Sequence, residues 1–205
     1  MMMKETLVSG IWSPHEAFYL ESMLFCTTSA LGAAQQVRAA LHVGSQHPPS
    51  SPVWRESAKA IVNGVQTVAI HAAALSRYFW PVRRGEPQAS RAARLRAGLG
   101  VSDGNCLRNR DLRNHLEHFD ERLDVFCQEL VAGAILPTYV GPIGGDAEVP
   151  TYQFRAYYTD VGVFEVLGRR FELQPLLDEI QVVHDRLTLC AETGGRIPPK
   201  WRTVG

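Results

Sequence analysis

Three side chains that can bind anions and transfer protons lie close together near the middle of this 205-residue chain. They are the guanidinium of Arg113, the amide of Asn114 and the imidazole of His118. Arg113 and Glu117, like Asn114 and His118, are four residues apart, and such residues are neighbours on a helix. The three groups would therefore share one rigid surface, suited to binding an anion and to proton transfer near neutral pH.

One long amphipathic helix, over residues 105–131, is predicted to position these groups. Its apolar residues recur every three or four positions, at Leu112, Leu116, Phe119, Leu123, Phe126 and Leu130. At about 100° per residue these side chains stay within about 40° of one line and form a stripe that faces the core. Arg113, Asn114 and His118 are expected to point away from this stripe, with Val125 adding an apolar residue to the outward surface.

Charge is unevenly distributed, although the formal net charge is zero. Residues 77–113 contain nine arginines and three acids, whereas residues 114–129 contain five acids and one arginine. A basic segment that leads into the helix of interest would attract phosphate. The alternative is that both charged segments solvate exposed helix faces or pair with each other.

Three helices are predicted before this one. The first begins at Ser13, where Glu16 would complete a capping box, and it runs to Gly44. The second spans residues 52–80, because Ser51 and Pro52 form a helix start and Pro81 ends the run. The third is short and rich in alanine and arginine, over residues 86–99.

The chain changes character after the fourth helix. Residues 137–150 are rich in glycine and proline and are predicted to form a loop. Residues 151–158 alternate between apolar and polar, and with residues 161–167 they predict a β-hairpin. Residues 170–173 are expected to add a third short strand.

A final helix is predicted from Pro175, and the tail over residues 196–205 is predicted to be irregular. The apolar face of this helix carries Leu176, Ile180, Val183, Leu187 and Cys190. The expected fold is mainly α, an antiparallel helical bundle over residues 1–136. Residues 137–205 would add a linker, a β-hairpin and a final helix that pack on the bundle, so that the chain forms one structural unit.

The segment Arg113-Asn114-His115-Leu116-Glu117-His118, on a late helix of an all-helical region, resembles the HEPN superfamily. The signature of that family is an arginine, usually followed by a polar residue, and then a histidine after four to six intervening positions. Here four residues separate Arg113 from His118, and Asn114 is the polar neighbour. The resemblance covers roughly residues 14–132 and leaves the hairpin and the final helix outside a minimal domain.

The resemblance implies a metal-independent endoribonuclease whose site forms where two motif helices face each other across a homodimer. In the implied reaction His118 takes the proton from a ribose 2′-hydroxyl, while Arg113 binds the phosphate and stabilises the charge that develops on it. Asn114 would orient His118 or the phosphate. Arg110 and Glu117 are expected to contribute to substrate binding. The products would be a 2′,3′-cyclic phosphate and a 5′-hydroxyl, with no metal or cofactor required.

The expected partners are RNA, a second copy bound through the helix over residues 105–132, and a regulatory protein. A first alternative is a non-catalytic RNA-binding or assembly module that uses the same helix as a dimer seam. A second alternative is a helical bundle that binds a small ligand near Tyr78, Phe79 and Trp80. His115, which borders the core stripe, is an alternative histidine for the site.

Cysteine usage and hydropathy indicate a cytoplasmic protein. The four cysteines form no CxxC pair and are expected to be reduced thiols, and no metal site is predicted. The first residues include Glu5 and lack an apolar run with a cleavage site, so no signal peptide is expected. No segment approaches the roughly 20 apolar residues of a membrane span.

Overall fold

A computed structural model describes residues 11, 13–83, 85–130, 132–144 and 150–202. Three predictions fall on residues outside the described ranges. They are the expected absence of a signal peptide at residues 1–10, the end of the motif helix at residue 131, and the irregular tail at residues 203–205. The fold is mainly helical with one small four-stranded sheet, which confirms the predicted mainly α class.

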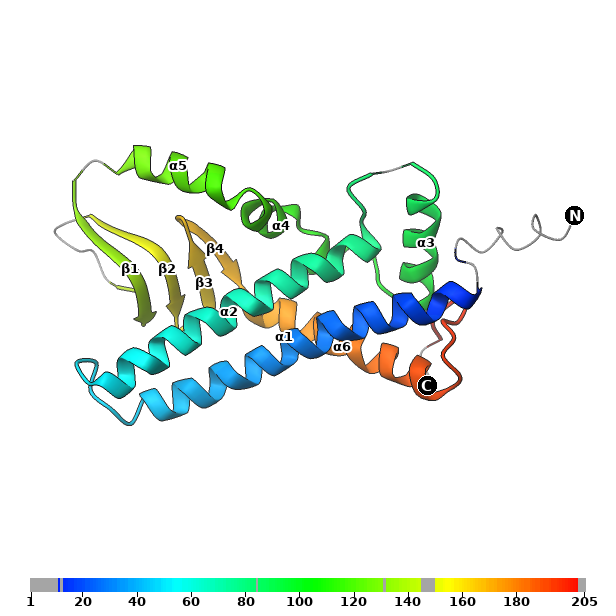
Figure 1. Cartoon of the computed structure of the whole chain (residues 1–205), viewed down its shortest axis with the longest axis horizontal. Coiled ribbons are helices and arrows are strands. Elements are labelled where there is room, and N and C mark those ends of the chain that lie inside the picture. Colours follow the sequence, from blue (N-terminus) through cyan, green and yellow to red (C-terminus); the bar gives the residue numbers. More distant parts are fainter. Residues whose placement is uncertain (1–10, 12, 84, 131, 145–149, 203–205) are drawn as a thin grey trace, which may run out of the picture.

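Two long antiparallel helices form the frame of the molecule (Figure 1). Helix α1 spans Glu16–Gly44 and α2 spans Pro52–Phe79, and a 3-10 turn over Ser13–His15 precedes α1. The hydroxyl of Ser51 caps α2 by accepting a hydrogen bond from the Trp54 backbone N–H at 3.0 Å. Both predicted helices are therefore confirmed to within a few residues.

Two further helices complete the frame. Helix α3 (Gln88–Gly98) stands at the end of the pair where α1 begins and α2 ends, and α6 (Leu173–Glu192) packs along α1 (Figure 1). The predicted apolar face of α6 is buried at every position, namely Leu176, Ile180, Val183, Leu187 and Cys190. None of the described helices is long and apolar enough to cross a membrane.

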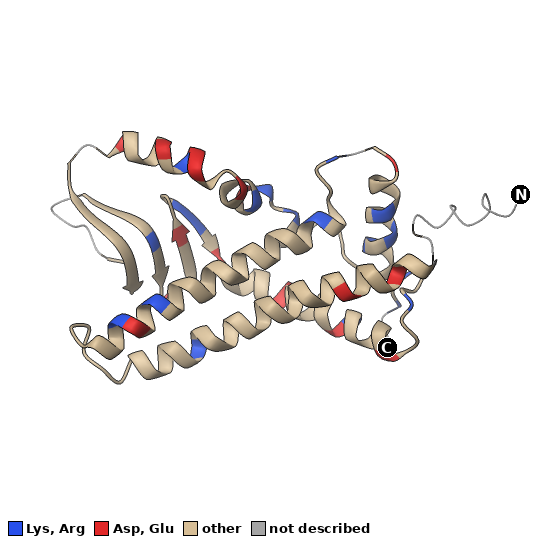
Figure 2. Cartoon of the chain, viewed as in Figure 1, with Lys and Arg blue, Asp and Glu red and all other residues tan. Residues whose placement is uncertain are grey.

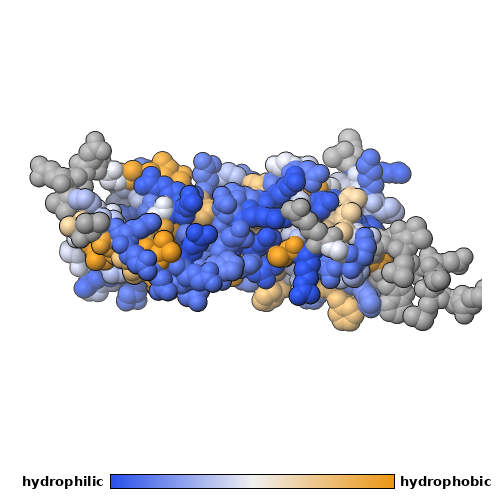
Figure 3. Space-filling model, turned by 90° about the horizontal axis from the view of Figure 1, so that it is seen from above, coloured by the Kyte–Doolittle hydropathy of each residue, from blue (hydrophilic) through white to orange (hydrophobic). Residues whose placement is uncertain are grey.

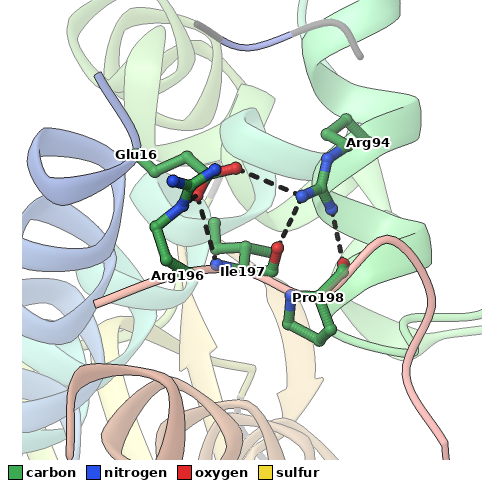
Figure 4. Close-up of polar contacts among 5 residues, drawn as sticks. All are labelled: Glu16, Arg94, Arg196, Ile197 and Pro198. Atoms are coloured by element: carbon green, nitrogen blue, oxygen red, sulfur yellow. Dashed lines mark hydrogen bonds and ion pairs between the residues drawn. The ribbon is translucent and has the colours of Figure 1, made fainter. Parts of the chain in front are cut away.

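The capping box predicted at the start of α1 is wrong. Glu16 is only 2% exposed, and its carboxylate accepts hydrogen bonds from Arg94 at 3.1 Å and from Arg196 at 2.6 Å (Figure 4). Arg94 also donates to the carbonyl oxygens of Ile197 and Pro198, at 2.5 Å each. Two arginines from distant parts of the chain thus replace the local backbone as partners of Glu16, and the carboxy-terminal segment is fixed against α1 and α3.

The sheet has the strand order β1-β2-β3-β4. The strands are β1 (Ala134–Gly141), β2 (Thr151–Tyr158), β3 (Val163–Val166) and β4 (Arg169–Glu172). The β2–β3 and β3–β4 pairs are antiparallel, which confirms the predicted hairpin and third strand. The loop predicted from Pro137 is wrong at its start, because β1 pairs in parallel with β2 as far as Gly141. Strand β1 also crosses the predicted boundary between residues 136 and 137.

The main core lies where β3 meets the helices. Phe164 and Val166 of β3 are fully buried, as are Leu75 and Phe79 of α2 and Ile180 of α6, and all belong to one apolar cluster. Burying a side chain of this size stabilises the fold by about 1.5–3 kcal/mol. The sheet and the helical frame therefore share one core.

Candidate functional site

The long motif helix predicted over residues 105–131 is wrong, because the backbone changes direction at His118. A 3-10 turn over Cys106–Arg108 is followed by α4 (Arg110–Glu117) and α5 (Phe119–Glu129). His118, with φ −109° and ψ 42°, ends α4 and begins α5. Both helices turn apolar side chains inward, so the apolar periodicity of the sequence continues across the break. The two helices nevertheless pack on different parts of the protein.

The predicted outward orientation of Arg113 is also wrong. Arg113 is 4% exposed, and its Nη1 donates a hydrogen bond to the Trp80 carbonyl oxygen at 3.2 Å. Burial lowers the pKa of Arg113, and the neighbouring cations Arg110 and Arg77 lower it further, while Glu117 opposes the shift. Arg113 faces inward because α4 lies between α2 and the sheet, so that two of its sides are covered.

Glu117 forms ion pairs with two arginines. Its Oε1 lies 3.7 Å from Nε of Arg113 and forms an ion pair with Arg77 of α2. The carboxylate of Glu117, on the same helix, thereby partly neutralises the charge of Arg113. Glu117, predicted to contribute to substrate binding, links α4 to α2 through Arg77.

Asn114 and His118 are exposed, as predicted. The Asn114 carbonyl accepts the His118 backbone N–H at 3.2 Å, which closes the last turn of α4. The His118 side chain is 55% exposed, and its Nδ1 lies 3.4 Å from Oε2 of Glu121. Arg113 and His118 thus have different acidic partners, Glu117 for Arg113 and Glu121 for His118.

His115, the alternative histidine, belongs to the core. Its Nε2 lies 3.0 Å from the carbonyl oxygen of Val166 in β3, and its ring centre lies 6.0 Å from that of Phe171 in β4. Burial lowers the pKa of His115, while the bond to Val166 partly opposes this shift. His115 therefore attaches α4 to the sheet and is not available to a ligand on the surface.

The stability of the protein is expected to fall as the pH is lowered through the ordinary histidine pKa of 6.5. The folded pKa of His115 lies below that value, so the unfolded chain takes up the proton first and the full stability is present only above it. Urea unfolding of the wild type between about pH 5 and pH 8 should show this slope, and His115→Gln should reduce it. Identical slopes in both proteins would contradict the assignment. Burial also lowers the pKa of His71. His71 therefore accounts for a slope that persists in His115→Gln.

Arginines of the basic segment converge on a pocket at the carboxyl end of α2. The pocket has a volume of about 590 Å³ and lies between α2, α3 and the start of α4. Its lining residues are Trp80, Pro81, Ala89, Ala92, Arg96, Arg108 and Arg110. Figure 2 shows blue on α3 and mostly red along α5, so basic and acidic parts lie on opposite sides of α4. Arg110, predicted to bind substrate, therefore lies in the same pocket as Arg96 and Arg108, which were not predicted as site residues.

The available sequence signal for this pocket was the excess of arginine over residues 77–113. That excess does not say which arginines meet, because Arg96 belongs to α3 and Arg108 to the 3-10 turn before α4. Of the aromatic residues considered for a small ligand, Phe79 is fully buried, whereas Trp80 lines the pocket.

Across the described ranges, no group of three His, Cys, Asp or Glu side chains is arranged to hold a metal ion. In comparisons with known proteins, the chain matches no family model, no curated protein and no solved structure.

Proposed function

We propose that this protein binds RNA through its basic segment over residues 77–113. The observation that carries the proposal is the exposure of Arg83, Arg108 and Arg110. Arg108 and Arg110 line a pocket without a carboxylate among its described lining residues. Exposed arginines in one region attract the phosphates of a nucleic acid and supply most of the affinity that does not depend on sequence. Arg113, which direct catalysis would require, is buried. This favours binding over cleavage.

We further propose that the helical part is a HEPN-like module. Two long antiparallel helices, and a later helix that carries Arg113 and ends at His118, support this relationship. The sheet and α6 would be additions to the module. Within this proposal the protein acts in the cytoplasm, where RNA is present. The proposal also includes a regulatory protein that binds this chain.

Replacing Arg83 with glutamate is expected to weaken binding of a fluorescently labelled single-stranded RNA by roughly threefold to tenfold, because it reverses one exposed charge in the basic segment. The slope of log affinity against log salt should become shallower as well. Arg55→Glu is the matched control, since Arg55 is exposed near the other end of α2. Fluorescence anisotropy at several salt concentrations measures both quantities. Equal affinities for the two variants would count against the basic segment as the binding surface.

A second candidate function is metal-independent cleavage of RNA, and the arrangement of His118 favours it. Glu121 lies on the Nδ1 side of the exposed imidazole, so Nε2 is left to take a proton from a ribose 2′-hydroxyl. A phosphate-binding role for Arg113 would require its guanidinium to leave the Trp80 carbonyl.

A homodimer through α4 and α5 would complete such a site. Val125 is 49% exposed on α5, and Ile135 and Leu136 are exposed on β1. Viewed from above, orange apolar patches lie at the end of the molecule that α5 and the sheet occupy (Figure 3). Burying these side chains against a second copy would stabilise the seam, and each His118 would then lie near an arginine of its partner.

A further inference from the structure

The pocket at the end of α2 combines arginines with a flat apolar wall. Three separate parts of the chain build it: the segment after α2, helix α3, and the turn that leads into α4. Its volume of about 590 Å³ falls within the range of roughly 300–1,000 Å³ that is common for sites of small ligands. The pocket is therefore large enough to hold a single nucleotide.

The polar side of the pocket is strongly cationic. Arg96, Arg108 and Arg110 line it, and its described lining residues include no acid. Asp103 lies nearby, 3.9 Å from Arg96 Nε and 3.8 Å from Arg108 Nη1, but its side chain is 73% exposed. Ion pairs exposed to this degree contribute little free energy, so a phosphate can replace Asp103 as the partner of these arginines. Guanidinium groups bind phosphate oxygens with strong, charge-assisted hydrogen bonds.

The apolar side of the pocket is formed by Trp80, Pro81, Ala89 and Ala92. The Arg96 guanidinium carbon lies 5.9 Å from the centre of the Trp80 ring, which joins the cationic side to the aromatic one. Trp80 is 8% exposed, and its indole N–H has no acceptor among the residues that the structure describes. This N–H is enclosed by the protein, so the wall meets a ligand through its apolar surface.

Arg113 supports this wall from the side of α4. Its Nη1 donates to the backbone carbonyl of Trp80 at 3.2 Å, and it is itself held by Glu117. The arginine of the HEPN-like motif is therefore a positioning residue for the pocket. Arg96, Arg108 and Arg110 line the pocket and are placed to meet a ligand directly.

We infer that this pocket binds one nucleotide, with its phosphate on Arg96, Arg108 and Arg110 and its base against Trp80 and Pro81. Stacking of a base on an aromatic wall beside arginines is a general means of binding nucleotides without reading their sequence. The choice of a nucleotide as the ligand rests on the proposed RNA function. The nucleotide is either the 5′-phosphorylated end of an RNA chain or a free nucleoside monophosphate.

Isothermal titration with adenosine 5′-monophosphate tests the pocket itself. Each of Arg108 and Arg110 is expected to contribute on the order of tenfold to affinity, so Arg108→Ala/Arg110→Ala should weaken binding roughly a hundredfold. Arg55→Ala, which removes an exposed arginine far from the pocket, should bind as the wild type does. The single variant Arg110→Ala, at an exposed position, keeps the test valid if the double variant unfolds. Absence of binding by the wild type, or equal affinities in all variants, overturns the inference.

Competition with short RNAs identifies the source of the nucleotide. Displacement of the bound monophosphate by a 5′-phosphorylated RNA, but not by the same RNA with a 5′-hydroxyl, supports the RNA end as the ligand. If the monophosphate binds and neither RNA binds the protein, the pocket stands as a site for a free nucleotide and the proposed RNA function fails. If RNA binds equally to the wild type and to the double variant, while the monophosphate does not bind the wild type, the RNA function stands and the pocket inference fails.

Discussion

RNA cleavage by the His118→Ala variant is expected to fall by about 100- to 10,000-fold if the protein is a ribonuclease, because a positioned general base contributes this much. The imidazole is exposed at the junction of α4 and α5, where a ribose can reach it, and Glu121 lies 3.4 Å from its Nδ1. The measurement is cleavage of end-labelled RNA in EDTA, with identification of the product ends. A 2′,3′-cyclic phosphate that disappears with His118 would establish metal-independent cleavage at this residue.

The control for His118 is another exposed histidine. His47 lies in the turn between α1 and α2, so His47→Ala should cleave as the wild type does. Equal cleavage by all three proteins would indicate a contaminating nuclease or a different site, and absence of cleavage by the wild type would leave RNA binding as the function. Arg113→Ala is a poor probe of catalysis, because it also removes the buried hydrogen bond to Trp80 and lowers stability.

Replacing Glu16 with alanine is expected to lower the free energy of unfolding by about 3 kcal/mol, near the lower end of the range for breaking a buried ion pair. Glu16 is almost completely buried and accepts hydrogen bonds from Arg94 and Arg196. Arg94, whose side chain is 13% exposed, would lose its counter-charge but keep two carbonyl acceptors, and Arg196 can turn to water. These remaining partners keep the loss near the lower end of that range. Urea unfolding at neutral pH measures the loss.

Glu56→Ala is the matched control for Glu16. Glu56 pairs with Lys59 at 2.8 Å, and both side chains are largely exposed. The loss of such a surface pair is expected to cost less than about 1 kcal/mol. A similar small effect for Glu16→Ala would mean that the network in Figure 4 contributes little to stability.

Elements defined by local pattern were predictable from the sequence. The cap at Ser51 and the apolar face of α6 depend on residues close in the chain, and both were found as predicted. Strand β1 was missed, because Pro137 and nearby glycines indicate a loop, whereas pairing with β2 is a contact between separate segments. The partners of Glu16 were missed for the same reason, since Arg94 and Arg196 are far from it in sequence.

The candidate site was only partly predictable. Periodicity placed His118 and Asn114 on the exposed side correctly, but it assumed that α4 has one buried face. Helix α4 packs on both α2 and the sheet, and the second contact surface buries Arg113 and His115. The position of Trp80 beside Arg96 and Arg108 depends on the packing of three segments, which no local pattern encodes.

The break at His118 divides the motif into two parts of unequal local stability. None of the residues of α5, Phe119–Glu129, is buried, and the helix rests on β2 through Phe119, whose ring centre lies 5.6 Å from that of Phe154. An element with so little buried surface opens at a much lower free energy than the core helices do. Hydrogen exchange in α5 can therefore proceed by subglobal unfolding while α4 and the arginine pocket remain folded. A ligand or second copy that packs on α5 would protect its amides from exchange, whereas a nucleotide in the pocket would not.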